Sequence, residues 1–389
     1  MLSFFASWEQ RKWIDTVNIS TNMVDPKSGK YNKFPHIGPG NIESFTGQFY
    51  DNVKTVEEEQ LISGKFHFYP GDIIYGKINP QLAKYVFPGF EGLCSADAYV
   101  LNSKNGLRQK YLYAILQTKD FYKYSVSVSM RSGMPKINRE ELNEYSFYAP
   151  NEKEQELIGR IFLNIDSLIT LHQRKYDKLV NVKKSLLEKM FPQNNSNVPE
   201  IRFKGFTDAW EQRKLLDVAQ YRNGKAHEND IDDDGKYVVV NSKFVSTNGE
   251  VRKNSNKQNE PLLKNEIAFV LSDVPNGRAL ARTYIVEKNG KYTLNQRIAG
   301  ITPNSDINPY YLYIIMNRNE YFLQFDDGAK QTNLSLDDMK KFEEYYPENK
   351  EQVAIGSLFE KIDSLITLHQ RKLEKLKNVK KSLLEKMFV

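Results

Sequence analysis

The most regular hydrophobic pattern in the chain occurs twice, and each copy predicts a long amphipathic helix. Apolar residues follow a spacing of three and four positions over Ile158–Leu186 and again over Ile355–Leu383, which is the period of one helix face. No glycine or proline interrupts the first copy between Ile161 and Met190, and Pro192 ends it. About 39 residues at 1.5 Å each make a rod on the order of 58 Å long.

The start of each predicted helix carries the same local signal. Just after a proline, Asn151 with Glu154 has the spacing of a capping box, and Asn349 with Gln352 repeats it. An asparagine side chain at this place accepts a backbone N–H of the first helical turn. We therefore expect these asparagines to cap both helices.

The stretch before each helix mixes short strand-like runs with turn residues. The strand-like runs are Phe66–Tyr69, Asp72–Tyr75 and Ala98–Leu101 in the first stretch, and Tyr237–Asn241, Glu266–Leu271 and Thr283–Val286 in the second. A helix pattern follows in each, at Lys110–Thr118 and Pro309–Asn317. The pattern predicts an α+β domain of about 150 residues, present twice.

The two predicted helices share one nearly identical segment. Ile165–Phe191 and Ile362–Phe388 match at 24 of 27 positions, and the exceptions are Tyr176/Leu373, Asp177/Glu374 and Val180/Lys377. The segment Trp8–Lys12 (WEQRK) likewise returns as Trp210–Lys214. Between these markers, roughly over 15–140 and 217–335, the halves share little. Repeated ends around divergent middles indicate one framework that carries two different recognition modules.

A rod with an apolar seam needs a partner, because helix stability comes mostly from packing. The other copy is the natural candidate, and antiparallel pairing within the chain would place one domain at each end with pseudo-twofold symmetry. His172, Lys175, His369 and Lys372 fall on the seam in mid-helix. We expect these polar residues to fix register and orientation.

The domain boundaries follow from these features and from the polar, proline-bounded linker Pro192–Pro199. The predicted parts are a first recognition domain at 1–149, a first helix at 150–192, a linker at 193–205, a second recognition domain at 206–346 and a second helix at 347–389.

Composition narrows the class of protein only slightly. The chain has 389 residues, 40% hydrophobic residues, one cysteine and a formal charge of +6, so a packed protein of two or three domains is expected without disulfides. A mildly basic charge permits a nucleic-acid partner but does not require one. No apolar run is long enough to cross a bilayer and no signal-peptide layout is present, so we expect a cytoplasmic protein without a membrane partner.

Candidate contact residues lie in the divergent parts and in two loops at matching places, Arg131–Ile137 and Gly328–Leu334. Lys and Arg neutralise phosphates, and Asn and Gln can pair with adenine. The same residues are also typical of ordinary exposed turns. The candidates are Lys77, Asn79, Gln81, Lys84, Arg131 and Lys136 in the first domain, and Arg278, Arg282, Asn295, Gln296, Arg297, Lys330, Gln331 and Asn333 in the second.

Catalytic motifs are not recognisable. Asn308-Pro309-Tyr310-Tyr311 comes closest to an adenine methyltransferase motif but lacks its second proline, and no phosphate-binding loop for ATP is found. Asp230-x-Asp232-x-Asp234-Gly235 imitates the first half of a calcium loop, but Asn241 replaces the glutamate that a calcium loop has at position 12. We predict no catalytic residue and no metal site in this chain.

The arrangement as a whole resembles the specificity subunits of type I restriction–modification systems. The resemblance covers nearly the full chain and rests on the doubled WEQRK segment, the doubled P…EQ approach and the doubled IDSLITLHQRK…KKSLLEKM helix. It implies two target recognition domains on an antiparallel coiled coil. Each domain would read one half of a split, asymmetric sequence in double-stranded DNA, and the helices would set the spacer between the halves.

The same resemblance implies partners that perform the chemistry. Two methyltransferase subunits would dock on the helices for N6-adenine methylation, and two nuclease/translocase subunits would complete the restriction enzyme. S-adenosylmethionine, ATP and Mg would then be bound by those partners and not by this chain. The alternative is a non-catalytic assembly scaffold with two protein-binding modules.

One departure from the repeat lies at the N-terminus. Val198–Phe203 precedes the second half, whereas the first half starts abruptly at Phe4–Trp8. Either a shortened N-terminus or a few missing residues would explain why the first half lacks this segment.

Overall fold

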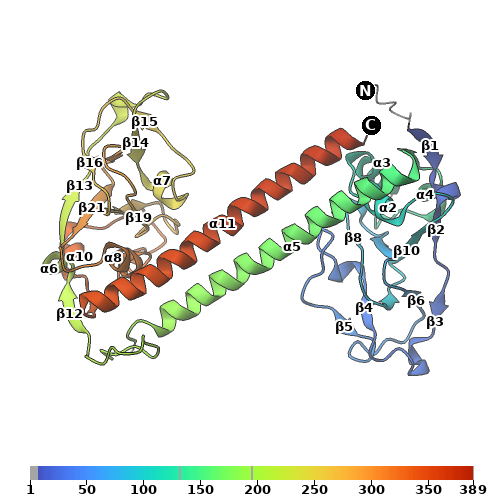
Figure 1. Cartoon of the computed structure of the whole chain (residues 1–389), viewed down its shortest axis with the longest axis horizontal. Coiled ribbons are helices and arrows are strands. Elements are labelled where there is room, and N and C mark those ends of the chain that lie inside the picture. Colours follow the sequence, from blue (N-terminus) through green and yellow to red (C-terminus); the bar gives the residue numbers. More distant parts are fainter. Residues whose placement is uncertain (1–7, 131–132, 194–195, 389) are drawn as a thin grey trace. The chain divides into compact units, whose positions relative to one another are not determined.

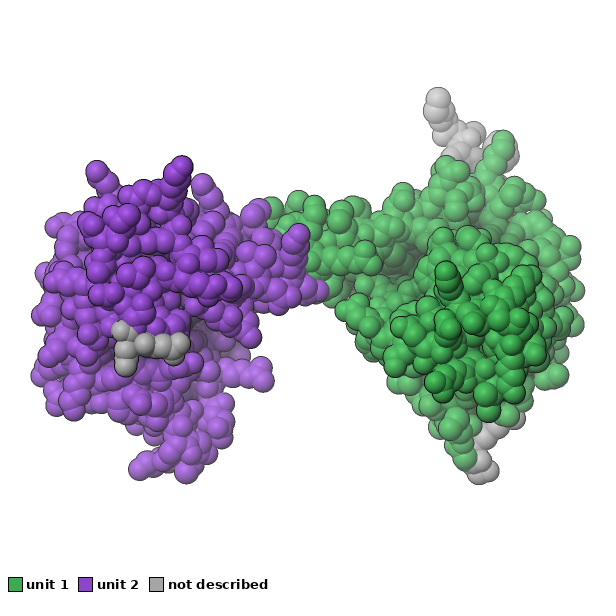
Figure 2. Space-filling model, turned by 90° about the horizontal axis from the view of Figure 1, so that it is seen from below, with its two compact units in different colours: residues 1–176, 368–389 green, residues 177–367 purple. Residues whose placement is uncertain are grey.

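The computed structural model describes residues 8–130, 133–193 and 196–388. The chain divides into two compact units (Figure 2). Each unit includes a part of both long helices. Unit 1 comprises residues 1–176 and 368–389, and unit 2 comprises residues 177–367. Among the described residues, no helix is long and apolar enough to span a membrane.

Unit 1 is built on two main sheets (Figure 1). The four-stranded sheet has the order β2 (Val17–Ile19), β10 (Ala98–Ser103), β7 (Ile73–Gly76) and β8 (Tyr85–Val86). The five-stranded sheet has the order β3 (Met23–Val24), β6 (Lys65–Phe68), β9 (Gly92–Cys94), β4 (Pro35–Ile37) and β5 (Lys54–Thr55). Only β4 and β9 pair in parallel within these two sheets.

Unit 2 repeats most of this topology although its sequence differs, and its second sheet has four strands, without a counterpart of β3. Its sheets have the order β13 (Ala219–Asn223), β21 (Ile298–Pro303), β17 (Ile267–Val270) and β19 (Thr283–Ile285), and the order β15 (Asn254–Ser255), β14 (Tyr237–Val240), β20 (Tyr292–Leu294) and β16 (Pro261–Leu262). β14 and β20 form the parallel pair. The predicted strands and the α+β class are therefore confirmed, with strand ends that differ by one or two residues from the prediction.

The repeated WEQRK segments form the same element in both units. β1 (Glu9–Lys12) pairs with β11 (Ser146–Ala149), and β12 (Glu211–Lys214) pairs with β23 (Glu343–Tyr346). The short helices are α1 (Trp13–Thr16), α2 (Gln109–Ile115), α3 (Lys119–Ser129) and α4 (Arg139–Asn143) in unit 1, and α6 (Leu215–Val218), α7 (Ser242–Ser246), α8 (Pro309–Met316), α9 (Glu320–Leu323) and α10 (Leu336–Lys341) in unit 2.

The two long helices are α5 (Glu152–Lys189) and α11 (Asn349–Met387), with 38 and 39 residues. Asn151 accepts the backbone N–H of Glu154 at 3.1 Å, so the predicted cap of α5 is confirmed. The predicted cap of α11 is wrong. Asn349 is already helical, the carbonyl of Glu348 accepts the N–H of Gln352, and the Asn349 side chain instead donates to the carbonyl of Asp306.

A buried glutamine joins each long helix to its domain, which explains the repeated P…EQ signature. Gln155 donates to the carbonyl of Pro150 at 2.8 Å and accepts the N–H of Arg108. Gln352 donates to Pro347 at 2.9 Å and accepts the N–H of Asn308. Each glutamine thereby satisfies groups at the starts of two helices, because buried polar groups need such partners.

The helices pair in antiparallel orientation, as predicted. In unit 1, Phe162 packs on Phe388, and Asp166 forms an ion pair with Lys380 at 2.6 Å. In unit 2 the equivalent contacts join Phe359 to Phe191 and Asp363 to Lys183, also at 2.6 Å. Because the same sequence supplies both sides, each contact occurs once in each unit.

The histidines of the seam face each other within unit 1. Nδ1 of His172 lies 2.8 Å from Nδ1 of His369, so their predicted place at the helix pairing is confirmed. Lys175 and Lys372 are predicted to lie on the same seam, but their side chains are exposed, because a long aliphatic stem carries the ammonium group into water.

This histidine pair predicts that helix pairing in unit 1 weakens in acid. Burial and the neighbouring Lys175 and Lys372 lower the pKa of both histidines below 6.5. A base with a lowered folded-state pKa binds fewer protons when folded than when unfolded, so stability is lost as pH falls through about 6.5. We expect hydrogen exchange around residues 168–176 to quicken, relative to its intrinsic rate, between about pH 7 and pH 5. The variant His172→Asn/His369→Asn should not show this acid dependence.

Candidate nucleic-acid interface

Three connections meet at one end of the four-stranded sheet of unit 1. They are the β7–β8 connection (77–84), the β9–β10 connection (95–97) and the segment 133–137. The N–H of Lys77 donates to the carbonyl of Asp97 at 3.1 Å, and the N–H of Ile137 donates to the carbonyl of Lys77 at 3.0 Å. Asn79 donates to Pro135 in the same way at 2.8 Å. The structure therefore brings together predicted residues that are far apart in sequence.

Unit 2 builds the equivalent site with other side chains. The N–H of Leu271 donates to the carbonyl of Arg297 at 3.1 Å, and the N–H of Leu334 donates to the carbonyl of Leu271 at 2.8 Å. β18 (Ser272–Asp273) pairs with β22 (Thr332–Asn333), which joins the 271–282 connection to the loop 328–334. The two domains thus carry different residues at the same place in one topology.

The candidate side chains of unit 1 differ in availability. Lys136 and Gln81 are exposed, and Asn79 is half-buried with a positive φ of 51°. The Lys77 ammonium lies 5.3 Å from the centre of the Tyr99 ring. Arg131 lies outside the described residues.

Lys84 is engaged by the protein itself. Its ammonium donates to the carbonyl of Pro39 at 2.5 Å, so this lysine holds the 39–41 turn against the β7–β8 connection. A sequence pattern could not show this contact, because Pro39 lies 45 residues away.

The second site offers a larger set of uncommitted cations. Arg278, Arg297 and Lys330 are exposed, and their side chains make no hydrogen bond or ion pair within the described parts of the chain. Arg282 donates to the carbonyl of Arg278 at 2.5 Å, and burial together with Arg318 lowers the pKa of its guanidinium.

The amide side chains of this site are mostly paired within the unit. Gln331 donates to Ser272 at 2.9 Å and to Asn333 at 3.1 Å, and Gln296 donates to Glu228 at 2.8 Å. The side-chain oxygen of Asn295 is buried and accepts no hydrogen bond from the described residues. Base contacts by Gln296 or Gln331 would require these internal bonds to be exchanged.

Asp273 is a structural residue of the site that the sequence interpretation missed. Its carboxylate accepts the N–H groups of Val274 at 2.9 Å, Ala279 at 2.6 Å and Leu280 at 3.1 Å, and so closes the 274–280 loop that carries Arg278. A Cβ at Gly277 would lie 2.1 Å from this carboxylate, so a larger residue there would push the carboxylate away from the N–H groups that donate to it. The turn signal Asp-Val-Pro-Asn-Gly could have identified this loop.

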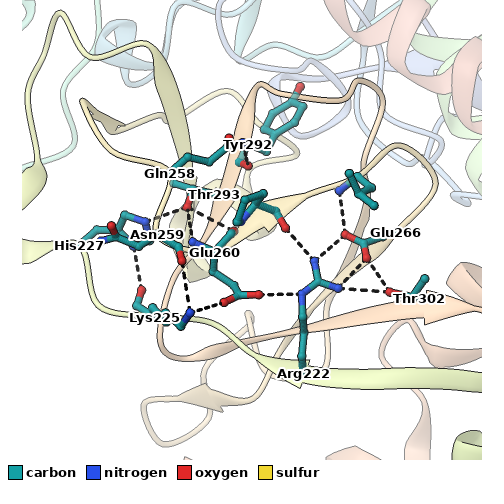
Figure 3. A network of polar contacts seen from close by, with 12 residues as sticks. Arg222, Lys225, His227, Gln258, Asn259, Glu260, Glu266, Tyr292, Thr293 and Thr302 are labelled. Carbon is teal, nitrogen blue, oxygen red and sulfur yellow. Dashed lines mark hydrogen bonds and ion pairs between the residues drawn. The ribbon is translucent and has the colours of Figure 1, made fainter.

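A second missed feature is the ion network around Arg222 (Figure 3). Arg222 donates twice to Glu266, at 2.5 and 2.6 Å, and once to Glu260 at 3.0 Å. Burial by itself raises the pKa of Glu266, but hydrogen bonds from Arg222 and Thr302 hold the pKa below its ordinary value. These contacts join the strands of unit 2. Because two carboxylates already neutralise Arg222, this residue is not a candidate for phosphate contact.

Residues of the methyltransferase-like motif (308–311) and of the calcium-loop-like motif (230–235) have structural roles. Asn308 caps α8 by accepting the N–H of Tyr311 at 3.0 Å, and Pro309 takes the first helical position. Asp230 forms an ion pair with Lys257 at 2.9 Å. Among the described residues, no group of three or more histidine, cysteine or acidic side chains is placed to hold a metal ion.

The comparisons with known proteins agree with this architecture. The family model of the type I restriction modification DNA specificity domain matches residues 7–181 and 207–378. The chain therefore belongs to the family of type I restriction–modification DNA specificity domains. The two matches correspond to its two recognition modules, each with its helix.

Individual relatives match only parts of the chain, at modest sequence identity. The chain is 31% identical over 189 residues to the type I restriction enzyme EcoDI specificity subunit of Escherichia coli, which is 48% of this chain and 41% of that protein. It is 24% identical over 144 residues to the MjaVIII specificity subunit of Methanocaldococcus jannaschii, covering 36% and 33%. The matched part thus spans less than half the length of either curated relative.

A solved structure shows the same fold along the whole chain. The S subunit of a type I restriction–modification system from M. genitalium matches with a TM-score of 0.65 at 15% identity, covering 100% of this chain and 98% of that one. At this identity the likeness concerns the fold.

Proposed function

We propose that this chain is the non-catalytic DNA specificity subunit of a type I restriction–modification enzyme. Its recognition domains, at 1–149 and 206–346, would each read one half of a two-part sequence in double-stranded DNA, and the helices at 150–192 and 347–389 would set the unread spacer. The observation that carries the proposal is the repeated topology with different side chains at the same strand ends. Such a design keeps a framework constant while the base contacts change.

The proposed partners follow from the same family membership. Two methyltransferase subunits and two nuclease/translocase subunits would bind S-adenosylmethionine, ATP and Mg and would act on DNA in the cytoplasm. The repetition of exposed helix residues such as Leu168 and Leu365, both more than 40% exposed, supports a partner that binds twice.

Substitution of the exposed arginines of the second site tests whether this site reads DNA. Arg278→Ala and Arg297→Ala should each weaken binding to the target duplex by about 1–3 kcal/mol if they contact bases. A phosphate contact would instead weaken binding to all sequences and lower the salt slope by about 1. Binding is measured by fluorescence anisotropy with the assembled methyltransferase at several salt concentrations.

A matched control is available at the opposite strand ends. Lys288 is exposed in the β19–β20 connection, and antiparallel pairing of β17 with β19 places this connection away from the 271–282 loop. Lys288→Ala removes the same charge and should leave binding unchanged. If all three variants changed DNA binding equally, or if binding did not depend on sequence and salt, the alternative of a non-catalytic assembly scaffold would be favoured.

A further inference from the structure

A pocket of about 620 Å³ lies within unit 1, between the recognition domain and the two helices. Its apolar lining includes Phe45, Tyr85 and Leu116 from the domain, Ile169 from α5 and Leu384 from α11. Phe45 is 54% exposed. This volume is in the range of ligand-binding pockets.

The wall around Phe45 is held in a costly backbone conformation. Phe45 and Ala83 both have positive φ angles, 65° and 43°. The N–H of Phe45 donates to the carbonyl of Ala83 at 3.0 Å, and the Tyr85 hydroxyl donates to the carbonyl of Phe45 at 2.9 Å. Non-glycine residues in this region cost on the order of 1–3 kcal/mol and cluster at functional sites.

Positive charge surrounds the apolar lining. Lys119, Lys377 and Lys381 line the pocket, are exposed and form no ion pair within the described residues, against a single unpaired carboxylate, Glu385. Lys380 is already neutralised by Asp166 at 2.6 Å. The pocket therefore suits an occupant with an apolar group and neighbouring negative charge.

Two differences at the matching place in unit 2 concern side chains that line this pocket, Lys377 and Asp166. Within the matched segments Ile165–Phe191 and Ile362–Phe388, Lys377 is one of three positions that differ, and its counterpart in unit 2 is Val180. In unit 2 the Tyr310 hydroxyl donates to Asp363 at 2.8 Å. At the matching place in unit 1, Lys110 turns to Glu156 instead, at 2.7 Å. Asp363 corresponds to Asp166 of unit 1, which lines the pocket and has Gln117, at 3.5 Å, and Lys380 as its partners.

We propose that this pocket binds an acidic polypeptide segment of a partner protein, which inserts one large apolar side chain, once per chain. Burial of an aromatic or aliphatic anchor supplies most of the affinity in such contacts. The three lysines select carboxylates beside the anchor. Because the pocket belongs to unit 1, it would distinguish one end of a framework whose helices are otherwise repeated.

A polypeptide fits better than duplex DNA does. Phosphates could neutralise the lysines, but a paired duplex exposes no apolar group that would fill a cavity lined by Leu116, Ile169 and Leu384. An unfilled apolar cavity gains nothing from that contact.

The test uses a short capped peptide with one phenylalanine between aspartates, titrated calorimetrically into the full chain. We expect one peptide per chain, affinity that falls with salt, and binding lost when the peptide phenylalanine becomes alanine. Lys381→Glu should weaken binding about tenfold or more, and Ile169→Trp should abolish it by filling the pocket.

The repeat supplies controls that alter the same residue in the same helix sequence. Lys184→Glu and Ile366→Trp place these changes in unit 2 and should leave peptide binding unchanged. No binding, two peptides per chain, or equal losses in matched variants would overturn the proposal. Displacement of the peptide by duplex DNA, or equally tight binding of phenylacetate, would also overturn it. The assay contains no DNA or partner subunit, so its failure is separate from failure of the proposed function.

Discussion

Replacing Glu351 with alanine is expected to lower the free energy of unfolding of unit 2 by about 3–5 kcal/mol. Glu351 is fully buried in the first turn of α11, and both of its oxygens accept from Arg202, each at 2.7 Å. The Arg202 side chain is only 12% exposed. Removal of the carboxylate therefore leaves its guanidinium buried and without a partner. Breaking such a pair costs far more than the intact pair contributes.

Hydrogen exchange with mass spectrometry measures this effect in each unit separately. Protection should fall across unit 2 and remain in the recognition domain of unit 1. The matched variant is Glu154→Ala, because Glu154 has the same place in α5 but is half-buried and forms no ion pair among the described residues. Equal losses of protection in the two variants would show that the Arg202 contact contributes little.

Replacing Phe388 with alanine should destabilise unit 1 by about 2–3 kcal/mol, somewhat less than a fully buried phenylalanine would. The Phe388 ring lies 6.1 Å from Trp8, 5.5 Å from Tyr111 and 5.8 Å from Phe162, measured between ring centres. This residue follows α11, whose first part belongs to unit 2. The loss should nevertheless appear in the first recognition domain, which packs against it.

Phe191 provides the reciprocal variant. It follows α5 and packs on Trp210, Tyr311 and Phe359 of unit 2. Phe191→Ala should reduce hydrogen-exchange protection of the second recognition domain and spare the first. If each variant instead affected the unit in which its helix begins, the antiparallel pairing would be wrong.

The fold could be predicted where the sequence repeats or alternates regularly. The helix period, the repeated segments and the strand runs all depend on local spacing, and the structure confirms them. The predicted cap at Asn349 is wrong because a tertiary contact with Asp306 competes for the same side chain. The role of the repeated glutamines, Gln155 and Gln352, could not be predicted, because their partners precede the distant helices α2 and α8.

The candidate site was predictable as a set of loops but not as a set of available side chains. Lys84 and Gln296 have the right chemistry, yet Pro39 and Glu228 engage them. The pocket of unit 1 could not be foreseen, because residues as distant as Phe45 and Leu384 form it. Partner choice among polar side chains depends on distances that composition and spacing do not contain.

We propose that two recognition modules of this chain read one split DNA sequence. Single-molecule mapping of methylated adenines tests it most directly, on DNA modified by this chain with its methyltransferase, before and after residues 15–140 are exchanged for those of another family member. We predict two short sequences separated by a spacer of fixed length and indifferent composition, with only one of them changed by the exchange. A continuous target, or an exchange that changes both halves or neither, would contradict the account.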